Sequence, residues 1–144
     1  MRIKCSKPKI NEYDFLRLLS STMIMQKQNI IIRKYDLEKK LYDFYDKPDF
    51  QLLFEDICRK KSIDNNYVDL NTAFQSAITF GLLILIKGNG DVRFIINITE
   101  EEATKISSEF NPDEIIAMNK LCNKLNEVKM NDKPLVLTKL KKMH

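Results

Sequence analysis

The feature that most constrains the fold is a change in hydrophobic pattern between residues 83 and 98. Residues 83–87 (Leu-Ile-Leu-Ile-Lys) and 92–98 (Val-Arg-Phe-Ile-Ile-Asn-Ile) are short runs of β-branched and aromatic side chains, which are typical of strands. Residues 88–91, Gly-Asn-Gly-Asp, join the two runs and contain Asn-Gly, a dipeptide that tolerates the positive φ angles of a tight turn. The sequence therefore predicts a β-hairpin at 83–98.

Helical periodicity dominates the segment before this hairpin. Asn11 is a suitable N-cap for a helix that runs to about Gln28, and residues 30–32, Ile-Ile-Ile, favour a strand or an extended connector. Three shorter helices follow: Asp36 caps one at about 37–45, Pro48 begins one that runs to about Lys60, and Asp69 caps one at about 70–82. Residues 62–67 are polar and turn-like.

Two more helices are predicted after the hairpin. Thr99 and Glu102 have the spacing of a capping box, which opens a helix to about Phe110. Asn111 and Pro112 have the cap-then-proline order of a second helix start, and that helix runs to about residue 129.

These elements predict an α+β fold, mostly helical, with one β-hairpin in a single domain of residues 1–144. A length of 144 residues fits one domain, and only 3 glycines and 4 prolines argue against an all-β fold rich in tight turns. Residues 35–98 form the predicted core, 99–130 the C-terminal helices and 131–144 a basic tail.

The order of elements between Tyr35 and Ile98 resembles that of the winged helix-turn-helix superfamily. Three short helices precede a two-stranded hairpin, and residues 69–83 (Asp-Leu-Asn-Thr-Ala-Phe-Gln-Ser-Ala-Ile-Thr-Phe-Gly-Leu-Leu) look like a recognition helix that ends at Gly81 and leads into a wing. In DNA-binding members the third helix lies in the major groove and the wing reaches along the backbone. The competing interpretation is an unrelated α+β bundle with one hairpin.

The resemblance implies two sets of DNA-contacting residues. Polar side chains on the outward face of the third helix would contact base edges, and these are Asn71, Thr72, Gln75 and Ser76. Basic side chains would contact phosphates, and these are Lys87 and Arg93 on the wing and Arg59, Lys60 and Lys61 at the end of the second helix. A solvated polar helix face would have the same composition as the first set.

The charge distribution leaves two functions open. The chain carries a net charge of +4, yet residues 63–98 hold only Lys87 and Arg93 against Asp64, Asp69 and Asp91. Affinity for DNA depends largely on phosphate neutralisation, so this near-neutral region argues against DNA binding. The sequence predicts a small DNA-binding regulator, repressor or antitoxin-like, or alternatively a protein-interaction module, an adaptor or inhibitor on a degenerate winged-helix scaffold.

Enzymatic activity is not expected. The only histidine is His144, which leaves no internal Ser–His or Cys–His nucleophile pair. Cys5, Cys58 and Cys122 lie more than 50 residues apart and lack the paired spacing of zinc ligands, and no glycine-rich phosphate-binding motif occurs. We expect neither a cofactor nor a bound metal ion.

An apolar stripe on the predicted helix at 112–129 indicates a homodimer. It is wider than the docking of one short helix requires, and its members are Ile115, Met118, Leu121, Cys122 and Leu125. The alternative is that the N-terminal helix at 11–28 covers this stripe within one chain. No apolar run is long enough to span a membrane and the N-terminus does not resemble a signal peptide, so a cytoplasmic location is expected.

Overall fold

A computed structural model of the protein confirms the mainly helical α+β fold. The structure describes residues 10–61, 63, 65–86, 88, 90 and 92–132, and helices account for more than half of them. In chain order the elements are α1 (Glu12–Met25), β1 (Ile31–Arg33), α2 (Lys34–Phe44), the short 3-10 helix η2 (Pro48–Phe50), α3 (Gln51–Phe54), β2 (Cys58–Lys61), β3 (Asn66–Asp69), α4 (Asn71–Thr79), β4 (Leu83–Ile86), β5 (Arg93–Ile96), α5 (Glu100–Ser107) and α6 (Pro112–Asp132).

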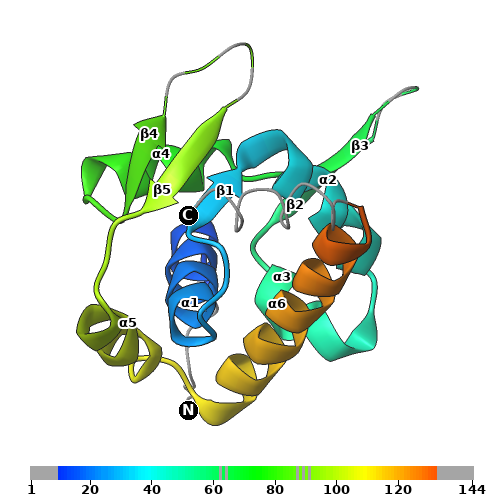
Figure 1. Ribbon diagram of the computed structural model, residues 1–144. Helices are drawn as coiled ribbons and strands as arrows, with labels where there is room; N and C mark the ends of the chain where they lie inside the picture. The colour runs from blue at the N-terminus through cyan, green and yellow to red at the C-terminus, as the bar shows by residue number, and fades with distance from the viewer. Residues whose placement is uncertain are drawn as a thin grey trace.

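The strands form two separate antiparallel sheets (Figure 1). The predicted hairpin at 83–98 is confirmed as β4 and β5, and β1 pairs with the other edge of β5 to give a three-stranded sheet in the order β1-β5-β4. In this register Phe94 lies opposite both Ile32 and Leu85. The side chains of Ile32, Phe94 and Ile96 therefore share one buried face, which packs on the helices.

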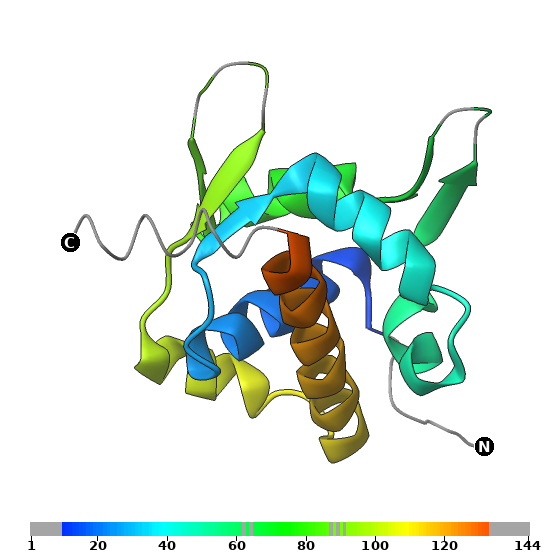
Figure 2. The ribbon, with the colours of Figure 1, turned by 45° about the vertical axis from the view of Figure 1, so that its right-hand side comes forward.

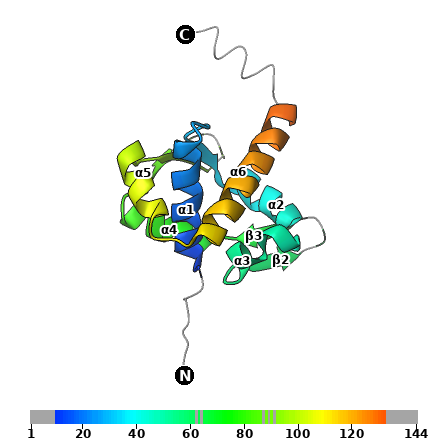
Figure 3. The ribbon, with the colours of Figure 1, turned by 90° about the horizontal axis from the view of Figure 1, so that it is seen from below.

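Helix α1 is the centre of the helical part of the fold. It lies between α5 and α6, and α4 also packs against it (Figures 1 and 3). Its apolar face is fully buried, and the members of that face are Phe15, Leu16, Leu18 and Leu19. The aromatic rings of Phe74 and Phe94 stack with their centroids 4.7 Å apart and their planes at 11°, so α4 is joined to the sheet directly.

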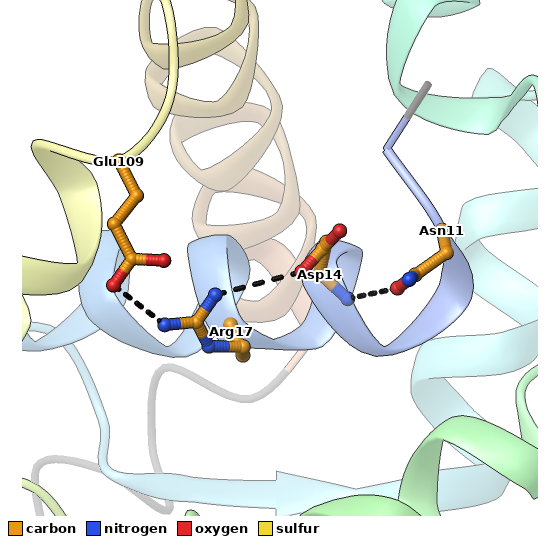
Figure 4. Close-up of polar contacts among 4 residues, drawn as sticks. All are labelled: Asn11, Asp14, Arg17 and Glu109. Carbon is orange, nitrogen blue, oxygen red and sulfur yellow. Dashed lines mark hydrogen bonds and ion pairs between the residues drawn. The ribbon is translucent and has the colours of Figure 1, made fainter. Parts of the chain in front are cut away.

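Side-chain caps fix several helix starts, as the sequence predicts. The Asn11 side chain accepts a hydrogen bond from the Asp14 backbone N–H at 2.7 Å, and Thr99 and Glu102 form a complete capping box. Arg17 then ties α1 to the turn between α5 and α6, donating to Glu109 at 2.8 Å and lying 3.5 Å from Asp14 (Figure 4). The hydrogen bond from Arg17 lowers the pKa of Glu109, but this exposed pair stabilises the fold by about 1 kcal/mol at most.

The structure corrects the predicted second helix. The sequence predicts a helix from Pro48 to about Lys60, but the helical segment that begins at Pro48 ends at Phe54. Residues 58–61 form strand β2. The segment 62–67, predicted to be a turn, contributes its last residues to β3. The two strands pair in an antiparallel hairpin, so the fold has a second hairpin that the sequence did not predict.

The predicted dimer interface on α6 is also corrected. Met118, Leu121 and Cys122 are buried in the core of their own chain, and Ile115 and Leu125 pack against that core. Helices α1 and α3 and the 3-10 helix η2 lie against α6. The alternative, in which the N-terminal helix covers the apolar stripe, is therefore observed. Met118, Leu121 and Cys122 are therefore not available to a second copy of the chain.

The two cysteines that the structure describes differ sharply in accessibility. Cys58 is exposed on β2, whereas Cys122 is buried and burial raises the pKa of its thiol. The thiolate is the reactive species, so a raised pKa suppresses reaction at neutral pH. We expect a maleimide to modify Cys58 within minutes in native protein and Cys122 only after unfolding, as read by mass spectrometry in a Cys5→Ser background. Equal labelling rates at the two sites would contradict the packing of α6.

Candidate nucleic-acid interface

Helix α4 connects two hairpins. It follows β3 after one residue, Leu70, and precedes β4 by only three residues, Phe80 to Leu82. Figure 2 shows that the β2–β3 and β4–β5 hairpins extend from the same side of the molecule, one at each end. The helix predicted to read DNA therefore bridges the bases of two projecting arms.

The predicted base-reading residues lie mainly on the exposed face of α4. Asn71, Thr72 and Gln75 are exposed, whereas Ser76 is half-buried at the border of the face. The opposite face is buried, and its members are Ala73, Phe74 and Ala77. The Thr79 hydroxyl donates to the backbone carbonyl of Gln75 at 3.0 Å. Three of the four predicted residues are thus accessible to a ligand.

A buried carboxylate fixes the N-terminal end of α4. Glu38 of α2 is only 2% exposed, and its Oε2 accepts a hydrogen bond from the Leu70 backbone N–H at 3.1 Å. Its other oxygen lies 3.1 Å from the Lys34 ammonium, which also sits over the aromatic rings of Tyr35 and Phe74. Sequence reasoning missed Glu38; the only signal is that it follows Lys34 at the i,i+4 spacing of a helical ion pair.

The C-terminal end of α4 is fixed by a glycine and an asparagine. Gly81 has a φ of 81°, a left-handed conformation that lets the chain turn out of the helix, as the sequence predicts. The Asn97 side chain donates to the Gly81 carbonyl at 3.1 Å, and the Asn97 backbone N–H donates to Leu82 at 2.8 Å. The exit of α4 is therefore attached to the end of β5.

The basic residues predicted at a helix end lie instead on strand β2, where Arg59, Lys60 and Lys61 are all exposed. Arg59 forms an ion pair with Asp46, and its guanidinium lies over the Tyr45 ring, 5.0 Å from the centroid. Arg59 therefore anchors the hairpin to the segment after α2. Lys60 and Lys61 form no ion pair within the part of the chain that the structure describes.

On the β4–β5 hairpin, only one of the two predicted wing residues can be placed. Lys87 lies outside the described residues. Arg93 is half-buried on β5, directly opposite Arg33 of β1, so the two side chains share one face of the sheet. Its guanidinium reaches back to the turn, where a Cβ added at Gly88 would lie 2.8 Å from the Arg93 Nη2 atom.

Acidic groups surround the start of α4. The pKa of Glu12 is raised by burial and by the neighbouring carboxylates of Asp69 and Asp56. A phosphate placed at this point would meet negative charge. This end of α4 is therefore unfavourable for an anionic ligand.

A second kind of surface lies at the opposite end of α4. Ile78, Phe80, Ile84 and Leu85 are exposed there to between 41% and 70%, and residues 78–86 include no charged side chain. Strand β4 forms one edge of its sheet in the described structure, and Ile84 and Leu85 lie on its two opposite faces. Exposed apolar side chains beside an open strand edge are typical of protein contacts.

Among the described residues no helix has the length and apolar character needed to cross a membrane, and no cluster of acidic, cysteine or histidine side chains is grouped to hold a metal ion. No protein-family model, curated protein or solved structure matches the chain. The function must therefore be argued from the geometry of the two hairpins and α4.

Proposed function

We propose that the protein is a winged-helix, DNA-binding regulator of repressor or antitoxin-like type, acting in the cytoplasm, with α4 as its recognition helix. The observation that carries this proposal is the position of α4 between two hairpins that extend from the same side of the molecule (Figure 2). An α-helix fits the major groove, and an extended hairpin beside it reaches the phosphate backbone.

The side chains on α4 have the chemistry for base contacts. Asn71 and Gln75 carry amides that pair in bidentate fashion with adenine, and Thr72 offers a hydroxyl and a methyl group. No basic residue lies on α4, so its own contribution to affinity is small. The phosphate contacts fall to the flanking strands, which carry Arg93 and Lys60.

The test is binding of fluorescent duplex DNA, measured by anisotropy over a range of salt concentrations. We expect binding to random duplex at low salt that weakens steeply as salt rises. After selection of a preferred sequence, Gln75→Ala should weaken binding to it by about 1–3 kcal/mol and leave random duplex nearly unchanged. Gln51→Ala, at an exposed position on α3, is the matched control. A wild-type protein that binds no duplex at low salt would refute the proposal.

A second candidate function, a protein-interaction module, is favoured by one observation. The exposed apolar side chains of Ile78, Phe80, Ile84 and Leu85 offer anchors for a protein partner and none for phosphate. The two functions separate in the same experiment, because a protein-interaction module has no salt-sensitive affinity for duplex DNA. A Phe80→Ser variant should bind duplex as the wild type does if DNA is the ligand.

A further inference from the structure

We infer that the β2–β3 hairpin is a second DNA-contacting arm, in which Lys60 and Tyr67 contact the phosphate backbone beside the segment read by α4. This inference rests on the proposed DNA-binding function and deepens it, because it adds Tyr67 to the contacts and assigns the phosphate contact to Lys60 and not to the predicted Lys61. It follows from which residues share each face of the hairpin.

The register of the hairpin divides its side chains into two faces. Residues directly opposite in an antiparallel pair point the same way, and successive residues alternate. Lys60 lies opposite Tyr67 and Cys58 lies opposite Asp69, so these four share one face. Arg59 and Val68 are on the other face together with Lys61.

The second face is turned toward the body of the protein at its base. Val68 is fully buried, and β3 packs against α2. Arg59 is held there by Asp46 and Tyr45. The first face of the hairpin is therefore the one turned away from α2 and open to a ligand.

Asp69 shows the direction of the first face. Its side chain accepts a hydrogen bond from the Asn71 backbone N–H at 3.0 Å, so the base of this face lies beside the N-terminal end of α4. Lys60 and Tyr67 lie two residues further out than Cys58 and Asp69, which is about 7 Å along the strands. The backbone of Lys60 is therefore further out than the acidic Asp69 at the base of the hairpin.

The chemistry of the pair suits a duplex backbone. The Lys60 side chain is exposed and supplies a mobile positive charge for a phosphate. Tyr67 is partly exposed and supplies a phenol that donates to a phosphate oxygen while its ring packs against the sugar. Together they extend the contacted segment beyond the part of the duplex that α4 reads.

The experiment compares two lysines on the same strand. Lys60→Ala and Lys61→Ala remove the same charge from neighbouring exposed positions on opposite faces. We expect Lys60→Ala to weaken binding to all duplexes and to lower the slope of log affinity against log salt by about 0.9, whereas Lys61→Ala leaves the slope nearly unchanged. Tyr67→Phe should weaken binding without a change in slope. Hydroxyl-radical footprinting should show that Lys60→Ala loses protection on one flank of the wild-type site.

Failure of the inference is distinct from failure of the proposed function. Suppose that the wild type binds duplex, that Gln75→Ala loses sequence preference, and that Lys60→Ala and Lys61→Ala have the same effect. The contact from the hairpin is then refuted, whereas the assignment of α4 as the recognition helix is supported. If the wild type binds no duplex, both are overturned. Thermal melting of each variant excludes unfolding as the cause of weaker DNA binding. Lys60→Gln repeats the test with a side chain that is longer than alanine and also lacks the charge.

Discussion

Replacing Glu38 by alanine is expected to lower the free energy of unfolding by about 3 kcal/mol. This value is at the lower end of the range expected when one partner of a buried ion pair is removed. The substitution leaves the Leu70 backbone N–H without its acceptor and the Lys34 ammonium without its partner. The Lys34 side chain is 13% exposed and can turn partly toward water, so the loss is not larger. Urea denaturation followed by circular dichroism measures the change as a lower midpoint at constant slope.

The matched control for this substitution is on the same helix. Asp36 and Lys40 form an i,i+4 pair on α2, but the Asp36 side chain is 53% exposed. Asp36→Ala should therefore cost less than about 1 kcal/mol. Glu38→Gln keeps an oxygen for the Leu70 N–H and should fall between the two. Equal stability of Glu38→Ala and Asp36→Ala would show that the buried carboxylate does not hold α2 and α4 together.

Replacing Phe94 by alanine is expected to cost about 3–5 kcal/mol, the range for removing a large buried aromatic side chain. Phe94 is 2% exposed, lies opposite Ile32 and Leu85 in the sheet, and stacks on Phe74 of α4. Its loss leaves a cavity where the sheet and α4 meet, and a small domain has a total stability of only about 5–15 kcal/mol.

Two further variants keep this second prediction testable if the alanine variant does not fold. Phe94→Leu keeps part of the volume and should show a smaller loss in the same denaturation experiment. Phe80→Ala removes the same ring from a side chain that is 70% exposed and in contact with Tyr13, and should cost about 1 kcal/mol or less. A Phe94→Ala variant as stable as Phe80→Ala would refute the assignment of Phe94 to the core.

Much of the fold could be predicted from the sequence because its signals are local. A capping residue such as Asn11 or Thr99 acts on an amide two or three residues away, and the hairpin at 83–98 carries its turn and both of its strands in one segment. Gly81 is equally local, because a positive φ there ends α4 whatever surrounds it. Each of these features is set by a few consecutive residues.

The second hairpin could not be predicted because nothing local distinguishes its first strand from a helix. Residues 58–61, Cys-Arg-Lys-Lys, are all exposed and show no alternation between apolar and polar side chains. Only pairing with 66–69 defines the strand, and in that partner only Val68 is buried. Sequence reasoning therefore placed Arg59, Lys60 and Lys61 on a helix and overlooked Tyr67.

The apolar stripe on α6 illustrates another limit of sequence reasoning. Periodicity shows that Met118, Leu121 and Cys122 need a partner surface, but it does not say which chain supplies that surface. In the structure α1 supplies it, and the Cys122 thiol lies 4.0 Å from the Leu19 carbonyl oxygen. The width of the stripe reflects several neighbours within one chain, since α3 and η2 also pack there.

The attachment of α4 at both ends has a consequence for the entropy of recognition. Glu38 holds the amide that precedes the helix and Asn97 holds the carbonyl that follows it, so the backbone between them is ordered when the protein folds. A ligand that docks on the exposed face of α4 has only the rotamers of Asn71, Thr72 and Gln75 left to immobilise, at about 0.5–1.5 kcal/mol for each flexible side chain. The conformational entropy of this backbone is therefore lost when the protein folds, before any partner binds.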